Sequence, residues 1–104
     1  MKAVQTYRKN SAEWLGLKME IVGGKRYYVK EGMKIRIQAW QPDIHYDQMF
    51  MMVDKLTEEG VSVNMYYEPL NKSGWFVFVG KCFSAHQNLR TAFRLACTEF
   101  KNIK

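Results

Sequence analysis

This chain has few of the residues that mark disordered, disulfide-bonded or membrane-spanning proteins. Its 104 residues include only two prolines and seven glycines and no low-complexity stretch, which argues against a disordered protein. The two cysteines, Cys82 and Cys97, lack CxxC spacing and indicate neither a zinc site nor a disulfide framework. No apolar run approaches the roughly 18 residues of a membrane span. Residues 1–10 have no apolar segment of the secretory type, so we expect one cytoplasmic domain spanning 1–104.

Recognisable catalytic motifs are missing as well. The sequence contains no GxGxxG, P-loop or HExxH motif, and Gly23-Gly24 is a turn signal rather than a phosphate loop. His45 and His86 each precede a predicted helix, without a serine, cysteine or acidic partner at a recognisable motif spacing. We therefore expect a binding protein rather than an enzyme, with no cofactor and no metal.

Charge is distributed unevenly along the chain, whose net charge is +6. Residues 1–34 contain eight basic and three acidic residues, a net charge of +5. Residues 35–70 contain two basic and six acidic residues (net −4), and residues 71–104 contain six basic residues and one acid (net +5). This polarity suits an anionic ligand at one site and self-association elsewhere, although ordinary surface charge is the alternative.

The first half of the chain reads as a helix, a hairpin, a strand and a second helix. Residues 1–16 are the hardest segment to interpret, and a short helix is expected over 7–17. Strands over 18–22 and 25–29 flank Gly23-Gly24, a two-residue turn in which both positions need positive φ. Alternation over 35–39 predicts a strand, and a helix is expected to start near Tyr46 or Asp47 and to stop at Gly60.

The second half reads as another hairpin followed by the last helix. Strands are predicted over 61–67 and 75–79 around a turn at 71–74, and the strand 75–79 is apolar on both faces. The last helix, over 85–100 with a cap near Ser84, has a buried stripe at helical spacing: Leu89, Ala92, Phe93, Ala96, Cys97 and Phe100. Together these elements predict an α+β two-layer sandwich, one mainly antiparallel sheet with two helices on one face. The other face then needs a cover, which is the N-terminal segment, a second subunit or a ligand.

Arg90 and Arg94 stand one turn apart beside that buried stripe and are the first candidates for ligand binding. Two guanidinium groups on one rigid edge fit a phosphate or carboxylate. Glu99 is the only acid on the same helix, so intrahelical ion pairs cannot occupy both arginines. The alternative is two solvated arginines on the flank of an amphipathic helix. His86 lies at the predicted N-terminus of this helix, where backbone N–H groups favour anions, and is a further candidate contact.

Two other groups of residues are candidates for contacts with partners. Phe50, at the edge of the core face of the middle helix, and Met51, on its polar side, are expected to form a homodimer or higher homo-oligomer interface, unless the same chain covers them. Lys25, Arg26, Tyr27 and Tyr28 interleave basic and aromatic side chains in the first hairpin, a pattern that can stack on nucleotides but that more often reflects packing.

From Arg36 to Phe100 the chain resembles the phage ABA-sandwich domain, a family of small bacteriophage proteins. The segments that carry the resemblance are IQAWQPDIHYDQMFMMVDKLTEEG, GWFVFVGK and AHQNLRTAFRLACTEF. Phage proteins that counter the Thoeris defence system are similar in size and arrangement, and they sequester a cyclic ADP-ribose isomer or cyclic oligonucleotides without degrading them.

The resemblance implies a sponge for a phosphate-bearing immune nucleotide in the host cytoplasm. Arg90 and Arg94 match the family's arginine pair, and Trp75 or Tyr67 is the residue expected to stack on the base. The acidic, methionine-bearing helix matches the family's oligomer contact. Two alternatives stay open, an inhibitor of a host defence nuclease and a nucleic-acid-binding protein, and the acidic middle segment makes a continuous basic groove for nucleic acid less favourable.

Overall fold

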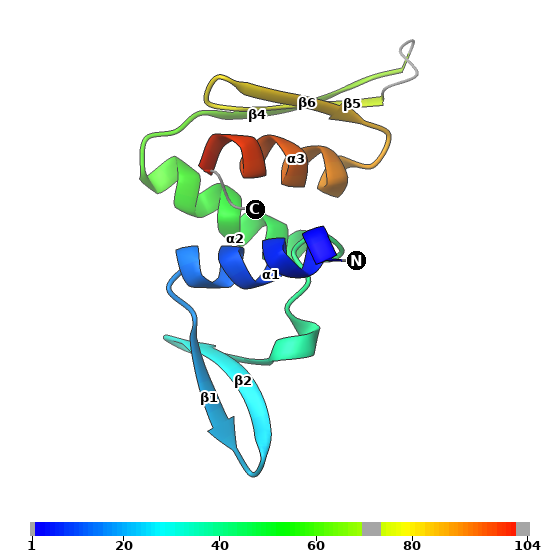
Figure 1. Ribbon diagram of the computed structural model, residues 1–104. Helices are drawn as coiled ribbons and strands as arrows, with labels where there is room; N and C mark the ends of the chain where they lie inside the picture. The colour runs from blue at the N-terminus through cyan, green and yellow to red at the C-terminus, as the bar shows by residue number, and fades with distance from the viewer. Residues whose placement is uncertain (1, 70–73, 102–104) are drawn as a thin grey trace.

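The chain forms an α+β fold in which three helices lie between two small antiparallel sheets (Figure 1). This description comes from a computed structural model that covers residues 2–69 and 74–101. The predicted α+β class is confirmed, but the strands divide into two three-stranded sheets instead of one. In chain order the elements are α1 (Lys2–Trp14), β1 (Lys18–Val22), β2 (Lys25–Lys30), β3 (Met33–Arg36), the 3-10 turn η1 (Ile37–Ala39), α2 (Tyr46–Glu58), β4 (Val63–Glu68), β5 (Gly74–Val79), β6 (Cys82–His86) and α3 (Leu89–Lys101).

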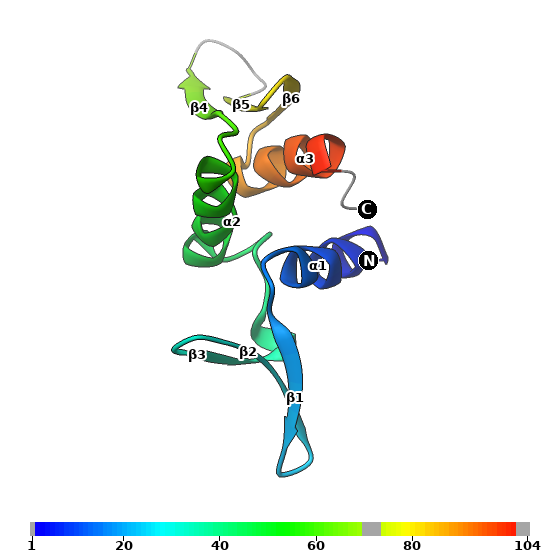
Figure 2. The same cartoon turned by 90° about the vertical axis from the view of Figure 1, so that its left-hand side faces the viewer.

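The N-terminal sheet, in the order β1-β2-β3, extends away from the helices (Figures 1 and 2). The predicted hairpin is confirmed, with Gly23 and Gly24 at φ of 59° and 78° between β1 and β2. The strand predicted over 35–39 ends early, at Arg36, because the chain turns inward through η1 to bury Trp40. There the indole Nε1 donates to the carbonyl of Arg8 at 3.1 Å, which fixes the loop before α2 against α1.

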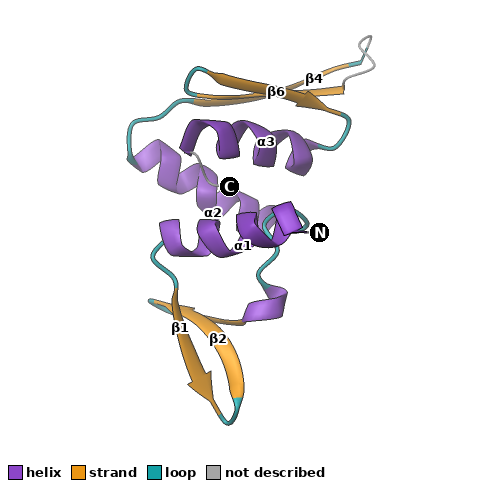
Figure 3. Cartoon of the chain, in the orientation of Figure 1, coloured by secondary structure: helices purple, strands orange, loops and turns teal. Residues whose placement is uncertain are grey.

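The C-terminal sheet, in the order β4-β5-β6, packs one face on α3 (Figures 1 and 3). Val77 and Val79 of β5 point to α3 and are fully buried, as the alternation predicts. The predicted start of the last helix at residue 85, with a cap at Ser84, is wrong, because residues 82–86 form β6. Strand β6 completes hydrogen bonding along the edge of β5, and α3 begins at Leu89. The side chain of Asn88 caps α3 instead, accepting a hydrogen bond from the Thr91 N–H at 3.1 Å. Residues 71–73 of the predicted turn lie outside the described residues.

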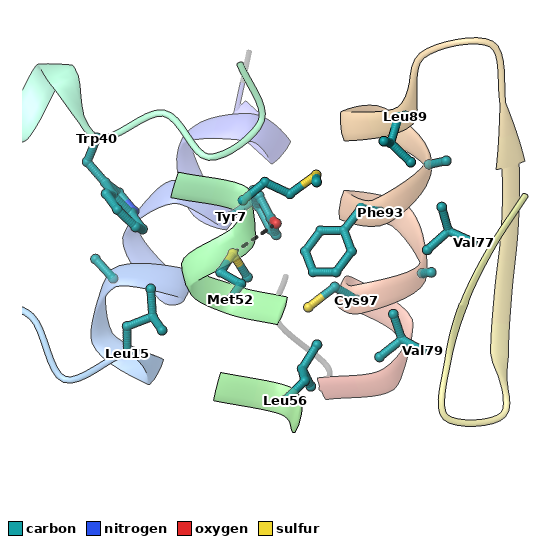
Figure 4. Packing of buried hydrophobic residues seen from close by; sticks show 14 of the residues in the cluster. Tyr7, Leu15, Trp40, Met52, Leu56, Val77, Val79, Leu89, Phe93 and Cys97 are labelled. Atoms are coloured by element: carbon teal, nitrogen blue, oxygen red, sulfur yellow. Dashed lines mark hydrogen bonds between the residues drawn. The ribbon is translucent and has the colours of Figure 1, made fainter. Parts of the chain in front are cut away.

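A single cluster of buried side chains joins the three helices to the C-terminal sheet (Figure 4). The predicted stripe of α3 is confirmed, with Phe93, Ala96 and Cys97 fully buried. Helix α1 spans Lys2–Trp14, so it starts earlier than the expected segment 7–17. It contributes Tyr7, whose hydroxyl donates to the sulfur of Met52 at 3.2 Å across the core. The region hardest to read in the sequence is therefore a core helix, and it sits against α2 and α3 rather than on the outer face of the C-terminal sheet (Figure 2).

Candidate functional site

Arg90, in the first turn of α3, contacts the loop and helix start opposite it. Its guanidinium carbon lies 4.5 Å from the centroid of the Tyr46 ring, within the range of a cation–π interaction. Its Nη1 donates to the backbone carbonyl of Ile44, while the Nε atom is buried without a hydrogen-bond partner among the described residues. Arg90 therefore ties α3 to the start of α2, and only part of its guanidinium remains for a ligand.

Arg94 lies one turn further along α3, and its charge acts on an acidic residue of the chain. Asp43, in the loop before α2, accepts two hydrogen bonds of 2.8 Å from Nε and Nη2 of Arg8 on α1. Burial alone would raise the pKa of Asp43. The hydrogen bonds and the charge of Arg8 outweigh this effect, and the charge of Arg94 contributes further, so the pKa of Asp43 is lowered. The positive charge of Arg94 is thus offset in part within the fold.

Tyr67, Trp75 and His86 come together in one row across the C-terminal sheet. They are direct cross-strand partners, Tyr67 opposite Trp75 and Trp75 opposite His86. The Tyr67 and Trp75 rings are tilted with centroids 5.4 Å apart, and His86 Nδ1 accepts a hydrogen bond from the Asn88 N–H at 3.0 Å. This row is the part of the predicted site that the structure does bring together.

The predicted oligomer contacts, Phe50 and Met51, differ in exposure. Phe50 is 46% exposed on α2 and is free to meet another molecule. Met51 is partly buried and packs against the core, although the sequence placed it on the polar side of the helix. The pair therefore does not form one continuous exposed patch.

An open groove of about 650 Å³ lies between α1, the N-terminal sheet and η1. This volume is within the range of small-molecule sites, which is about 300–1,000 Å³. The lining residues come from α1 and the turn after it, from β1, from β2 and from the segment around η1: Gln5, Arg8, Lys9, Glu13, Leu17, Met19, Arg26, Tyr28, Ile37, Gln38, Trp40 and Gln41.

Each wall of the groove follows from the periodicity of the element that forms it. On α1, residues 5, 9 and 13 repeat every four positions, so Gln5, Lys9 and Glu13 form one stripe beside the buried face of the helix. On the sheet, Met19 is the cross-strand partner of Tyr28, and Arg26 lies two residues from Tyr28 on the same side. A helical stripe with amide and charged groups thus faces a strand surface that carries an aromatic ring and a guanidinium.

The electrostatics of the groove leave two cations available to a ligand. Lys9 and Arg26 are exposed, and neither has a hydrogen-bond or ion-pair partner in the part of the chain that the structure describes. Arg8, which also lines the groove, is held by Asp43. Burial raises the pKa of Tyr28, and the nearby negative charge of Glu13 raises it further, so the phenol stays neutral near pH 7.

Most of this groove could not be located from the sequence, because α1, β2 and η1 meet only in the folded chain. One signal was present, the interleaving of Arg26 and Tyr28 in the first hairpin, a pattern that can stack on nucleotides but that more often reflects packing. Lys9 and Gln5 belong to the segment whose structure the sequence left unsettled. The groove does not include Arg90, Arg94 or the row of Tyr67.

No family model, curated protein or solved structure matches this chain. Within residues 2–69 and 74–101, no group of three or more histidine, cysteine, aspartate or glutamate side chains is arranged to hold a metal ion. The same residues contain no helix that is both long enough and apolar enough to cross a membrane. The arrangement of the groove is therefore the main physical guide to function.

Proposed function

We propose that the protein binds a small phosphate-bearing nucleotide in the groove between α1 and the N-terminal sheet. One observation carries the proposal: Lys9 on α1 and Arg26 on β2, which have no ion-pair partner among the described residues, line the same groove as the half-buried ring of Tyr28. A nucleotide combines an anion with a planar base, and each half has a matching surface here. The immune nucleotides implied by the sequence resemblance belong to this ligand class.

Each lining side chain has a role in this proposal. Arg26 and Lys9 neutralise the phosphate, and Arg26 does so with the planar fork that suits a pair of phosphate oxygens. The ring of Tyr28 stacks on the base, an interaction worth about 1–3 kcal/mol per base. Glu13 and the amide of Gln38 supply hydrogen bonds for the base and sugar, which gives selectivity over simple phosphate ions.

The proposed action is to hold the ligand rather than to transform it. The lining side chains include no serine, threonine, cysteine or histidine, so the usual nucleophile–base pairs are not at hand around the groove. Sequestration depends on slow dissociation, which burial of the base against the apolar part of the groove favours. The proposed function is therefore that of a nucleotide sponge.

Isothermal titration calorimetry tests this proposal with a fixed panel of cyclic ADP-ribose isomers, cyclic dinucleotides and ADP. We expect binding of at least one compound, with Lys9→Ala and Arg26→Ala each weakening it about tenfold or more, equivalent to about 1.4 kcal/mol. Tyr28→Leu should weaken nucleotide binding without changing the dependence on salt. Ligand recovered intact after incubation, by mass spectrometry, would support holding without reaction.

Lys25→Ala is the matched control for Arg26→Ala. Lys25 is the neighbouring basic residue on β2, it is equally exposed, and alternation places it on the opposite side of the strand from Arg26. Equal losses in the two variants would mean that overall positive charge, rather than the groove, attracts the ligand. Loss of binding in Arg90→Ala and Arg94→Ala but not in Arg26→Ala would move the site to α3, and absence of binding to the whole panel would refute the proposal.

A further inference from the structure

Four aromatic rings cover the outer face of the C-terminal sheet, the face opposite α3. Tyr66 of β4, Phe76 and Phe78 of β5 and Phe83 of β6 form one connected cluster, defined here as the aromatic face. Its ring centroids lie 4.8–6.2 Å apart. Tyr66 is 49% exposed and Phe83 is 44% exposed, so the cluster stands open to solvent in the single chain.

No described element of the chain covers the aromatic face. The helices lie on the opposite side of this sheet, and α1 is held there by Tyr7 in the core (Figure 2). Strand β5 nevertheless has apolar side chains on both sides, Val77 and Val79 toward α3 and Phe76 and Phe78 away from it. Apolar residues on both faces are typical of strands that are covered on both faces in the functional molecule.

The charges around the aromatic face decide between possible occupants. By alternation, the outer positions of the three strands are Asn64, Tyr66, Glu68, Phe76, Phe78, Phe83 and Ala85. Glu68, at the end of β4, is the only charged residue among them, and it is acidic. Among these described strand positions, a nucleic acid would find no cation to neutralise its phosphates. An uncharged apolar surface is instead complementary to a second copy of itself, because a two-fold axis places identical patches against each other.

We propose that two copies of this chain dimerise through their aromatic faces. The two three-stranded sheets then stack about 10 Å apart with their rings interdigitated, as in other sheet-on-sheet packings. Each sheet keeps α3 on its other side, so the dimer has two central sheets between outer helices. The interface excludes the groove between α1 and the N-terminal sheet, so this proposal stands or falls independently of nucleotide binding.

The size of the face sets the affinity to expect. From a strand spacing of about 4.8 Å and a rise of about 3.3 Å per residue, the face measures roughly 15 by 20 Å. Two such faces bury on the order of 600 Å² together, which is below the range of about 1,200–2,000 Å² for stable, specific protein interfaces. The expected dimer is therefore weak and transient, and it becomes visible only when the protein concentration is varied.

Sedimentation velocity over a concentration series, about 5 to 500 µM, is the direct test. The wild-type chain should shift from the monomer mass of 12.3 kDa toward twice that value. Tyr66→Lys and Phe83→Lys should each raise the dissociation constant at least tenfold, and the double variant should stay monomeric. Both residues are half exposed, so circular dichroism of these variants should match that of the wild type.

Phe50→Lys is the matched control, because Phe50 is 46% exposed but lies on α2. It should leave the dimer unchanged, and a dimer lost in this variant but kept in the aromatic-face variants would place the interface on α2. Intermolecular NOEs between Phe78 and Phe83 rings in a mixed labelled wild-type sample provide a second readout that needs no variant. A wild-type chain that stays monomeric throughout, or whose aromatic-face signals shift only with an oligosaccharide or single-stranded DNA, would overturn the proposal.

Discussion

Asp43, in the loop before α2, pairs with Arg8 of α1, and replacing it with asparagine tests how this loop is held. Arg8 of α1 donates two hydrogen bonds of 2.8 Å to the carboxylate, and the charge of Arg94 on α3 acts on it as well. The Asp43 side chain is only 11% exposed and that of Arg8 is 26% exposed. Asp43→Asn keeps the shape and removes the charge, which leaves the guanidinium group of Arg8 without its anion.

We expect this substitution to lower the free energy of unfolding by about 1–3 kcal/mol, the range for hydrogen bonds to charged groups that are largely shielded from water. For a chain of this size, each kcal/mol corresponds to about 4–8 °C in the midpoint of thermal unfolding. Arg8→Ala should cost at least as much as Asp43→Asn, because it leaves a carboxylate that is only 11% exposed without its two hydrogen-bond donors.

The pH dependence gives an independent readout of the same interaction. The pKa of Asp43 is lower in the folded chain than in the unfolded chain, so its stabilising contribution is present above the unfolded value of about 3.9. The contribution is lost as pH falls through the folded pKa. Urea unfolding followed by circular dichroism should therefore show a large difference between wild type and Asp43→Asn at pH 7, and a shrinking difference below about pH 4.

Two results would refute this reasoning about Asp43. A difference in unfolding free energy below about 0.3 kcal/mol at pH 7 would mean that the ion pair behaves like an exposed one. A difference that stays constant down to pH 2 would mean that the charge of Asp43 does not matter, and that the substitution acts through packing.

Two further predictions concern the core. Gly80→Ala should lower the free energy of unfolding, measured in urea, by at least about 1 kcal/mol more than Gly23→Ala does. The reason is steric, because a Cβ atom at residue 80 would lie 2.7 Å from the Phe100 ring. Both glycines have φ of 59°, so equal losses would remove the steric explanation. Burial raises the pKa of Tyr7 well above 10, so wild-type stability should fall more steeply above pH 10 than that of Tyr7→Phe. At neutral pH, Tyr7→Phe should lower the free energy of unfolding by about 0.5–1.5 kcal/mol, because the hydrogen bond to Met52 is lost. Parallel stability–pH profiles of wild type and Tyr7→Phe would contradict a raised pKa of Tyr7 in the folded chain.

Local patterns predicted those elements whose residues decide their own structure. The Gly23-Gly24 turn, the bounds of α2 near Gly60 and the buried stripe of α3 depend on φ preference, capping and helical period, which are visible within a few residues. The sequence did not predict strand β6, because its formation depends on another strand rather than on its own residues. Residues 82–86 form a strand because β5 offers an open edge beside them, and that edge exists only after β4 and β5 have paired.

The division into two sheets was also beyond local patterns. Alternation over residues 35–39 does not reveal that Trp40 will insert under α1, where its indole N–H donates to the Arg8 carbonyl and to the Ser11 hydroxyl. That insertion turns η1 away from the sheet and separates β3 from the later strands. A single buried tryptophan thus sets the boundary between the two sheets, and nothing in the periodicity of its neighbours shows it.

The basic residues divide into those that hold the fold together and those that are free to bind a ligand. Arg90 stacks on Tyr46 and bonds the Ile44 carbonyl, so Arg90→Ala should destabilise the chain whether or not a ligand is present. Lys9 and Arg26 are exposed and, among the described residues, have no hydrogen-bond or ion-pair partner, so their removal should change stability by less than about 0.5 kcal/mol. A cation that contributes nothing to folding and lines a groove is available for binding a ligand. The pattern of charges in the sequence identified the arginines on α3 first, because it records which residues are basic but not which of them the fold has already used.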